Sequence, residues 1–192
     1  MKKQRSILPR SYFNRPTLTV ARSLVGKYLI RCIDGREIAG KIVEVEAYVG
    51  SKDRACHASK GRTQRTEVMF GPAGVAYVYL IYGLYHCLNV VTEREEFPSA
   101  VLIRAIELDG ELIDGPGRLC RALEVDRRLN RVDLPTGESL WFEDRGEVVG
   151  RGRVGAYPPI GVDYAGPVAK KLGRFRLGRL TGPTLPRQTT KQ

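Results

Sequence analysis

The stretch Tyr77-Val-Tyr-Leu-Ile-Tyr82-Gly83-Leu-Tyr85-His-Cys-Leu-Asn89 contains two predicted strands and the turn between them. Apolar and β-branched residues on both sides of Gly83 favour strands, and the glycine permits the tight reversal that a hairpin needs. The turn places the side chain of Tyr82 next to this glycine. We therefore expect a β-hairpin whose tip carries an outward-pointing aromatic ring.

Further strands and a few helices are predicted around this hairpin. Alternating or apolar runs predict strands at residues 27–33, 38–48, 99–108, 139–142 and 147–153. Helices are predicted at residues 17–24 and 118–129, and a long surface loop at the polar, glycine-rich residues 50–74. Together these elements indicate an α+β fold, which we expect to be a single compact domain over residues 1–192. Its curved, mostly antiparallel sheet would carry flanking helices and the protruding hairpin.

The composition is typical of a globular protein with a sizeable core. Of the 192 residues, 42% are hydrophobic and 28% are charged. No run approaches the roughly 18 apolar residues of a membrane helix, and no signal peptide is evident, so we expect a soluble intracellular protein. The four cysteines form no C-x-x-C pair and there are two histidines, so we expect reduced thiols and no metal site.

The net charge of +11 is distributed unevenly along the chain. Residues 1–33 contain eight Lys or Arg and no acidic residue, and residues 164–192 contain seven and none. Fourteen of the 21 acidic residues lie between Glu93 and Glu147. This asymmetry predicts one positive face that binds a polyanion, with an affinity that falls as salt rises. The alternative is that these basic ends only solubilise the protein. Separately, we expect flexible basic tails at residues 1–9 and about 180–192.

The predicted strand at residues 38–48 carries two acidic side chains two positions apart. Strand alternation places Glu44 and Glu46 on one face, together with Ile42. The strand runs into the polar loop that contains His57, a position typical of a cleft where a carboxylate acts as a base on water. The alternative is an ordinary solvent-facing strand surface.

Arg104 lies within the apolar run of residues 99–108 and is therefore expected to be partly buried. A buried guanidinium needs an anionic or hydrogen-bonding partner. That partner could belong to a structural ion pair, or it could be a carboxylate or a water molecule in a site.

Eight short motifs occur in order along the chain. They are Glu46-Ala-Tyr48, Asp53-x-x-x-His57, Met69-Phe-Gly-Pro72, Tyr77-Val-Tyr79-x-Ile-Tyr82-Gly83, Cys87-x-Asn89, Leu102-Ile-Arg104-Ala105, Gly115-Pro-Gly117-x-Leu-Cys120 and Tyr164-Ala-Gly166. In this order and spacing the chain resembles the alkyladenine (3-methyladenine) DNA glycosylases. The resemblance spans about Leu8 to Phe175, which is nearly the whole chain.

The resemblance implies a base-excision repair enzyme that acts as a monomer on duplex DNA. Such an enzyme flips an alkylated or deaminated purine out of the duplex, and water then hydrolyses the N-glycosidic bond to leave an abasic site. The implied substrates are 3-methyladenine, 7-methylguanine, hypoxanthine and ethenoadenine. The family uses no cofactor, no metal and no lysine Schiff base. We expect no membrane association, and a cytoplasmic location in a bacterium or a nuclear one in a eukaryote.

The resemblance also implies roles for individual residues of the catalytic site. Glu46 matches the general base that deprotonates the attacking water, and Arg104 matches the arginine that helps to hold that water. Tyr48, His57 and Tyr79 match the side chains that enclose the flipped base.

Four further residues match the rest of the pocket and the hairpin. Tyr77 would be a supporting wall, and Asn89 would exclude guanine by obstructing its amino group. Tyr82 would fill the gap that the flipped nucleotide leaves in the DNA, with Leu84 beside it where many members carry methionine. The basic stretch Lys170–Arg174 replaces a more usual apolar run, and it receives no role.

Two other classes of protein are alternatives. A non-catalytic basic module that binds nucleic acid could use the same charges and tyrosines without requiring Glu46 or Arg104. A nucleoside-cleaving or formyl-transferring enzyme on a related fold is the second. Cleavage of a nucleoside needs no intercalating hairpin. A formyltransferase needs an Asn-His-Asp set, which cannot be assembled from the two histidines of this chain.

Overall fold

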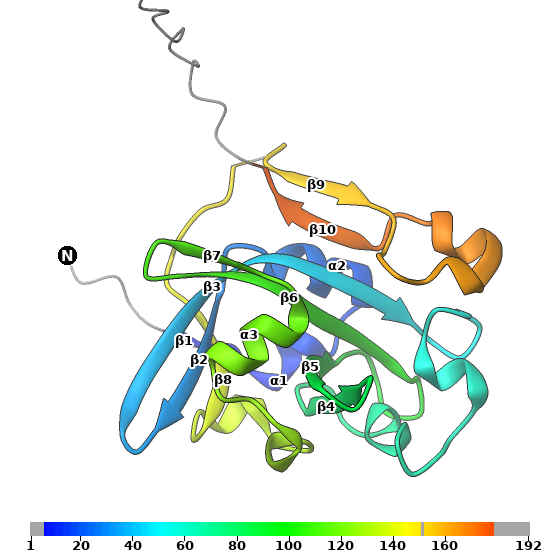
Figure 1. Ribbon diagram of the computed structural model, residues 1–192, viewed down its shortest axis with the longest axis horizontal. Coiled ribbons are helices and arrows are strands. Elements are labelled where there is room, and N and C mark those ends of the chain that lie inside the picture. The colour runs from blue at the N-terminus through cyan, green and yellow to red at the C-terminus, as the bar shows by residue number, and fades with distance from the viewer. Residues whose placement is uncertain (1–5, 151, 179–192) are drawn as a thin grey trace, which may run out of the picture.

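The computed structural model describes residues 6–150 and 152–178, which build one extended antiparallel sheet (Figure 1). The strands are β1 (Ser6–Ile7), β2 (Tyr28–Ile33), β3 (Arg36–Val49), β4 (Ala76–Ile81), β5 (Tyr85–Val91), β6 (Ser99–Leu108), β7 (Glu111–Asp114), β8 (Leu140–Asp144), β9 (Val154–Tyr157) and β10 (Arg174–Leu177). The main path runs β1-β8-β2-β3-β6-β5-β4, while β7 pairs with β6 and the β9–β10 ribbon pairs with β3 through β10. The predicted α+β class with a mostly antiparallel sheet is confirmed.

Within the described residues, three short α-helices and five 3₁₀ helices accompany the sheet. The α-helices are α1 (Arg10–Phe13), α2 (Thr17–Leu24) and α3 (Pro116–Ala122). The 3₁₀ helices are η1 (His57–Lys60), η2 (Glu67–Phe70), η3 (Arg127–Leu129), η4 (Leu134–Thr136) and η5 (Asp163–Lys170). Among the residues described, none of these helices has the length and apolar character needed to cross a membrane.

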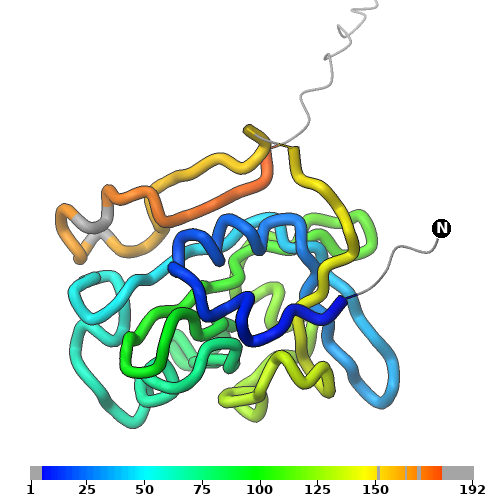
Figure 2. Tube along the Cα trace, turned by 180° about the vertical axis from the view of Figure 1, so that it is seen from behind, coloured from blue at the N-terminus to red at the C-terminus, as the bar shows by residue number. Residues whose placement is uncertain are grey.

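The helices cover opposite faces of the sheet. α1 and α2 lie behind the sheet in the view of Figure 1 and in front of it in Figure 2, whereas α3 lies on the other side. The buried side chains of α2 recur at helical spacing, and they are Thr17, Val20, Ala21 and Leu24. The three apolar ones belong to the main core together with Val45 and Ile103 of the central strands. The polar side chains of β3 are thereby left on the face that carries α3.

The strand β3 contains an irregularity that changes which residues share a face. Ile42 pairs with Ile106, Glu44 with Ala105 and Val45 with Ile103, so the register shifts between Ile42 and Glu44 and again between Glu44 and Val45. Such a shift is typical of a β-bulge and resets the alternation of side chains. Ile42 therefore lies in the core with Val45. The prediction that Ile42 shares a face with Glu44 is wrong for this reason.

Two predicted elements near the end of the chain differ from the structure. The helix expected at residues 118–129 stops at Ala122, because Glu124 adopts a positive φ of 48° and the chain turns before η3 begins. The strand expected at residues 147–153 is absent from the described residues of that range. Gly152, with a φ of 85°, precedes the true strand β9.

The N-terminal segment is shorter than the predicted tail. Ser6 and Ile7 pair with Asp144 and Glu143 of β8, and Leu8 is buried in the core. The expectation of a tail over residues 1–9 is therefore wrong for residues 6–8, because Ser6 and Ile7 are held by backbone pairing and Leu8 by apolar burial. The expected tails at residues 1–5 and 180–192 lie outside the described residues.

Candidate active site

A cavity of about 520 Å³ opens on the α3 face beside the β4–β5 hairpin. Eight of the nine predicted site residues line it, and these are Glu46, Tyr48, His57, Tyr77, Tyr79, Tyr82, Asn89 and Arg104. They come from β3, β4, β5, β6, the turn between β4 and β5, and the segment that follows β3. Leu84, the ninth, lies outside the cavity at the hairpin tip. The structure thus gathers residues that are spread over 59 positions of the sequence, from 46 to 104.

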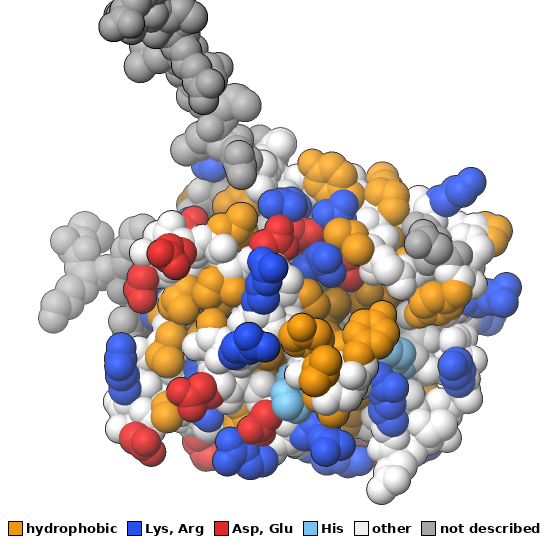
Figure 3. Space-filling view, in the orientation of Figure 1, with side chains coloured by type: hydrophobic (Ala, Val, Ile, Leu, Met, Phe, Trp, Pro, Cys, Tyr) orange, Lys and Arg blue, Asp and Glu red, His pale blue; other side chains and the backbone are white. Residues whose placement is uncertain are grey.

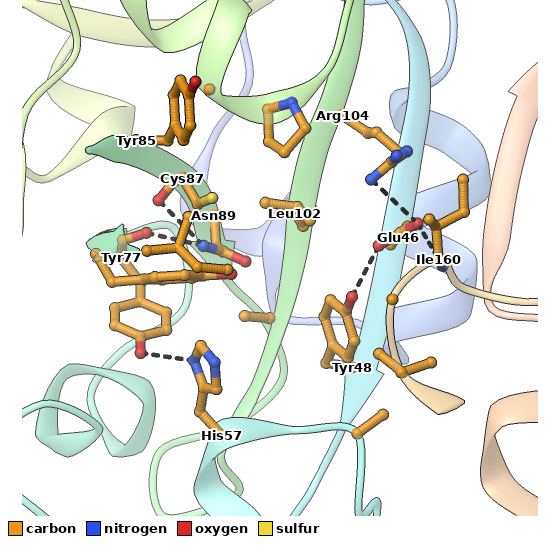
Figure 4. A pocket seen from close by; sticks show the side chains of 18 of the residues that line it. Glu46, Tyr48, His57, Tyr77, Tyr85, Cys87, Asn89, Leu102, Arg104 and Ile160 are labelled. Carbon is orange, nitrogen blue, oxygen red and sulfur yellow. Dashed lines mark hydrogen bonds and ion pairs between the residues drawn. The ribbon is translucent and has the colours of Figure 1, made fainter. Parts of the chain in front are cut away.

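Glu46 is a buried carboxylate whose two oxygens are both engaged (Figure 4). Its Oε2 accepts a hydrogen bond from the Tyr48 hydroxyl at 2.7 Å, and its Oε1 accepts one from the Ile160 backbone N–H at 3.0 Å. Burial raises the pKa of the Glu46 carboxyl, and the Tyr48 hydroxyl and the Arg104 charge partly oppose this shift. Because Glu46 is 1% exposed, the alternative of a solvent-facing strand surface is wrong.

Arg104 reaches the same carboxylate from the neighbouring strand β6. Its Nη1 lies 3.6 Å from Glu46 Oε1, and its Nε lies 3.5 Å from Glu44 Oε1. The predicted partial burial is confirmed, since the side chain is 17% exposed. Arg104 therefore belongs to an ion-pair cluster and also lines the cavity. The two alternatives, a structural ion pair and a place in a site, each describe part of its environment.

Aromatic side chains form much of the cavity wall. His57 Nδ1 and the Tyr77 hydroxyl are 3.0 Å apart, and the His57 and Tyr79 rings meet edge-on with centroids 4.6 Å apart. Tyr48 stands across the opening from Tyr77 in Figure 4. Burial, together with the charges of nearby basic side chains, lowers the pKa of His57 to about 4. The imidazole is therefore neutral near pH 7, and this aromatic part of the cavity wall carries no charge.

The loop after β3 is organised by an aspartate from the motif that includes His57. Asp53 accepts hydrogen bonds from the backbone N–H groups of Val49 at 3.1 Å and Ala55 at 3.0 Å. These bonds fold the chain back toward the sheet and deliver His57 to the start of η1. The predicted long loop thus contains η1 and η2 and forms one side of the cavity.

Asn89 is held rigidly in the cavity wall by the strand that carries it and by its neighbour. The side chain is buried, and its Nδ2 donates to the backbone oxygens of Tyr77 at 3.1 Å and Cys87 at 3.4 Å. Because both donors of the amide are directed to the backbone, the carboxamide cannot rotate without losing these bonds.

Over residues 6–150 and 152–178, no group of three His, Cys, Asp or Glu side chains is arranged to hold a metal ion.

The hairpin tip projects from the rim of the cavity as predicted. Tyr82 and Gly83 have φ values of 53° and 69°, and the Leu84 N–H donates to the Ile81 carbonyl, a combination typical of a type I′ turn. The Tyr82 side chain is 84% exposed and Leu84 is 74% exposed. Figure 3 shows hydrophobic side chains gathered over this hairpin, with Lys and Arg side chains around them on the same face.

Several cavity residues were not predicted from the sequence, and all but Tyr85 come from segments distant from the hairpin. Tyr85, Gly117, Arg118, Ile160 and Tyr164 all line the cavity. The Gly115-Pro-Gly117 and Tyr164-Ala-Gly166 motifs were local signals for three of these positions. Ile160 carried no signal, since it contributes a backbone N–H that any residue other than proline would supply.

Gly117 permits the close packing of α3 against the hairpin. A Cβ at this position would lie 2.9 Å from both Cβ and Cδ1 of Tyr85. We expect Gly117→Ala to lower the free energy of unfolding by roughly 1–3 kcal/mol, because the overlap displaces Tyr85 beside the hairpin turn. Urea denaturation measures this change. Gly150→Ala is the matched control, since its Cβ meets only the Arg153 side chain at 3.6 Å; equal effects of the two variants would contradict the packing argument.

The Tyr48 hydroxyl stabilises the ionised form of Glu46. We expect Tyr48→Phe to raise the pKa of Glu46 further, because the charged carboxylate loses a hydrogen-bond donor while its burial remains. The carboxyl ¹³C chemical shift of Glu46, followed through a pH titration by NMR, measures the shift. Tyr77→Phe is the control, because that hydroxyl contacts His57 and leaves Glu46 untouched. A titration identical to that of the wild type would show that the hydroxyl does not stabilise the anion.

The chain is similar to a known protein family and to several named proteins. A family model described as "Methylpurine-DNA glycosylase (MPG)" matches residues 11–179. A relative from Methanocella arvoryzae is 49% identical over 185 residues, covering 88% of this chain and 91% of its own. One from Myxococcus xanthus is 52% identical, with 83% and 84% coverage, and one from Legionella pneumophila (strain Corby) is 50% identical, with 88% and 92%. Each is named "Putative 3-methyladenine DNA glycosylase".

Proposed function

This chain belongs to the methylpurine-DNA glycosylase family, and from that premise we propose that it excises alkylated or deaminated purines from duplex DNA by base flipping. It is a monofunctional DNA glycosylase, so DNA is its substrate. The damaged purines that we propose are 3-methyladenine, 7-methylguanine, hypoxanthine and ethenoadenine. The enzyme would act as a monomer and leave an abasic site.

One observation carries this proposal: a buried carboxylate lies in an aromatic-walled cavity beside an exposed aromatic tip. A base inside a duplex is out of reach, so it must be extruded at a cost of a few kcal/mol. Stacking of a base on an aromatic ring recovers roughly 1–3 kcal/mol. The walls formed by Tyr48, His57, Tyr77 and Tyr79 offer such stacking inside the cavity, and Tyr82 offers it at the vacated position in the DNA.

Glu46 would act on a water molecule that attacks C1′ of the damaged nucleotide. The carboxylate takes one proton from the water, the water oxygen forms the new bond to C1′, and the N-glycosidic bond breaks with its electron pair leaving on the purine. The transition state resembles an oxocarbenium ion, which the ionised carboxylate also stabilises. The raised pKa of Glu46 suits a base that works near neutral pH. Arg104, whose Nη1 lies 3.6 Å from Glu46 Oε1, would help to hold the water.

The remaining wall residues would select among bases. The neutral His57 ring adds no charge next to the flipped purine, and the backbone at this position would contact the six-position of the base. Asn89 is fixed by two hydrogen bonds to the backbone, so it would obstruct the 2-amino group of guanine without yielding. Tyr77 supports His57 through the contact between its hydroxyl and Nδ1.

Base release from duplex oligonucleotides tests the proposal. Each duplex carries one hypoxanthine or one alkylated purine, and the reaction contains a chelator. We expect free base, and strand cleavage only after alkali reveals the abasic site. Tight, salt-sensitive binding without release from any lesion would instead favour a non-catalytic nucleic-acid-binding module.

A further inference from the structure

Glu44 is a second buried carboxylate, and it lies beside the proposed base on the same face of β3. Three guanidinium groups approach it: Arg174 Nη1 at 2.7 Å and Arg104 Nε at 3.5 Å from Oε1, and Arg176 Nη1 at 3.2 Å from Oε2. Glu44 is 1% exposed and is absent from the cavity lining. The contacts of Glu44 are therefore made inside the protein and not in the cavity.

The first group of contacts connects Glu44 to Arg104. The guanidinium lies between two carboxylates, at 3.5 Å from Glu44 Oε1 and 3.6 Å from Glu46 Oε1. The buried Arg104 Nε has no hydrogen-bond partner. Arg104 thus lies at a similar distance from both carboxylates without forming a close pair with either. This arrangement leaves Glu46 Oε1 free of a tight guanidinium contact.

The second group of contacts connects Glu44 to the β9–β10 ribbon, which lies along β3 (Figure 1). Arg174 donates to Glu44 Oε1 through Nη1 and to the Pro158 carbonyl through Nε at 2.9 Å. Two residues beyond Pro158, the Ile160 N–H donates to Glu46 Oε1. A continuous series of contacts therefore runs from Glu44 through Arg174 and the ribbon loop back to Glu46.

We propose that Glu44 is a positioning residue for the glycosylase reaction, because it fixes where both Arg104 and the Ile160 N–H meet the Glu46 carboxylate. This inference rests on the proposed role of Glu46. Without the Glu44 charge, Arg104 has a single carboxylate partner and closes on Glu46. The ribbon also loses its closest charged contact to β3, so the Ile160 N–H is held less firmly.

The charge-removing variant Glu44→Gln tests this positioning. We expect its single-turnover excision rate to fall roughly 100-fold, the effect expected when a catalytic group is misplaced by about 1 Å. The affinity for lesion-containing duplex should be unchanged, because Glu44 does not line the cavity. Glu44→Asp retains the charge and should recover part of the lost rate. Glu107 is an exposed carboxylate on β6, so Glu107→Gln is the control and should behave as the wild type.

The pH profile separates positioning from a purely structural role. The charged and titratable groups around Glu46 are Glu44 and Tyr48 of β3, Arg104 of β6, Cys87 of β5 and Arg174 of β10. In Glu44→Gln the positive charges of Arg104 and Arg174 are no longer shared with a second anion, so they favour ionised Glu46. The acid limb of the rate profile should therefore move to lower pH.

Hydrogen exchange of residues 154–177 gives a readout that is independent of activity. We expect faster exchange at the Ile160 amide in Glu44→Gln and in Arg174→Gln, but not in Glu107→Gln. The proposal would be overturned if Glu44→Gln kept the wild-type pH profile and the wild-type rate per folded molecule, even with a lower free energy of unfolding. If Glu44→Gln fails to fold, Arg174→Gln decides, and a wild-type rate and exchange pattern there would overturn it. Failure of the wild type to release any base would instead contradict the proposed function.

Discussion

Glu46→Gln is expected to abolish base excision while leaving DNA binding intact. A positioned general base contributes typically 10²–10⁴-fold, so the single-turnover rate should fall by at least about that factor. The glutamine side chain retains the shape of glutamate, and its oxygen can still accept a hydrogen bond from Tyr48. It lacks the charge that takes the proton from water and stabilises the developing oxocarbenium ion. The loss should therefore appear in the rate of release and not in the affinity for the duplex.

The matched control for this variant is Glu143→Gln on β8. Glu143 is also a buried carboxylate on the sheet, but it pairs with Trp141 and Arg145 outside the cavity. Its replacement should leave the excision rate per folded molecule unchanged. Retained excision in Glu46→Gln would remove Glu46 from the mechanism. A parallel fall in both variants would indicate a general effect of losing a buried charge.

The wild-type rate should rise with pH as Glu46 ionises. Burial raises the pKa of this carboxyl, so the acid limb of the rate profile should lie above the ordinary range for glutamate. The neutral His57, with a pKa lowered to about 4, does not contribute a limb near neutral pH.

The parts of the site that depend on local sequence could be predicted. The hairpin followed from turn chemistry, because Tyr82 and Gly83 occupy the two positions with positive φ. Alternation correctly placed Glu44 and Glu46 on one face of β3. It failed at Ile42, because a register shift depends on the partner strand β6, which a local pattern does not encode.

The contacts that connect distant segments could not be predicted in the same way. Ile160 meets Glu46 across 114 positions of the sequence, and Arg174 meets Glu44 across 130. The arginines of β10 belong to the basic residues 164–192, so charge alone suggested a polyanion-binding face or a solubilising end of the chain. Their pairing with Glu44 arises only when the ribbon lies along β3, and the burial of both glutamates results from the same packing.

Tyr82→Ala is expected to weaken binding to damaged duplex by roughly ten- to a hundredfold. The ring is 84% exposed, so it adds little to the core, and a surface substitution usually changes the free energy of unfolding by within about 0.5 kcal/mol. Its proposed contribution is to refill the stack after the purine has flipped, which is worth roughly 1–3 kcal/mol. Affinity and excision should therefore both fall while the melting temperature stays the same.

Two comparisons isolate the contribution of the ring. Tyr82→Phe keeps the aromatic face and should retain most of the affinity, whereas Val148→Ala removes an exposed apolar side chain away from the cavity and should have no effect. Fluorescence of a reporter base beside the lesion measures flipping directly, and titration of the duplex measures affinity. The difference between damaged and undamaged duplex should shrink in Tyr82→Ala, because only the flipped state leaves a gap to fill. Unchanged flipping and affinity would mean that the exposed ring stays outside the base stack, and the hairpin would then serve only to border the cavity.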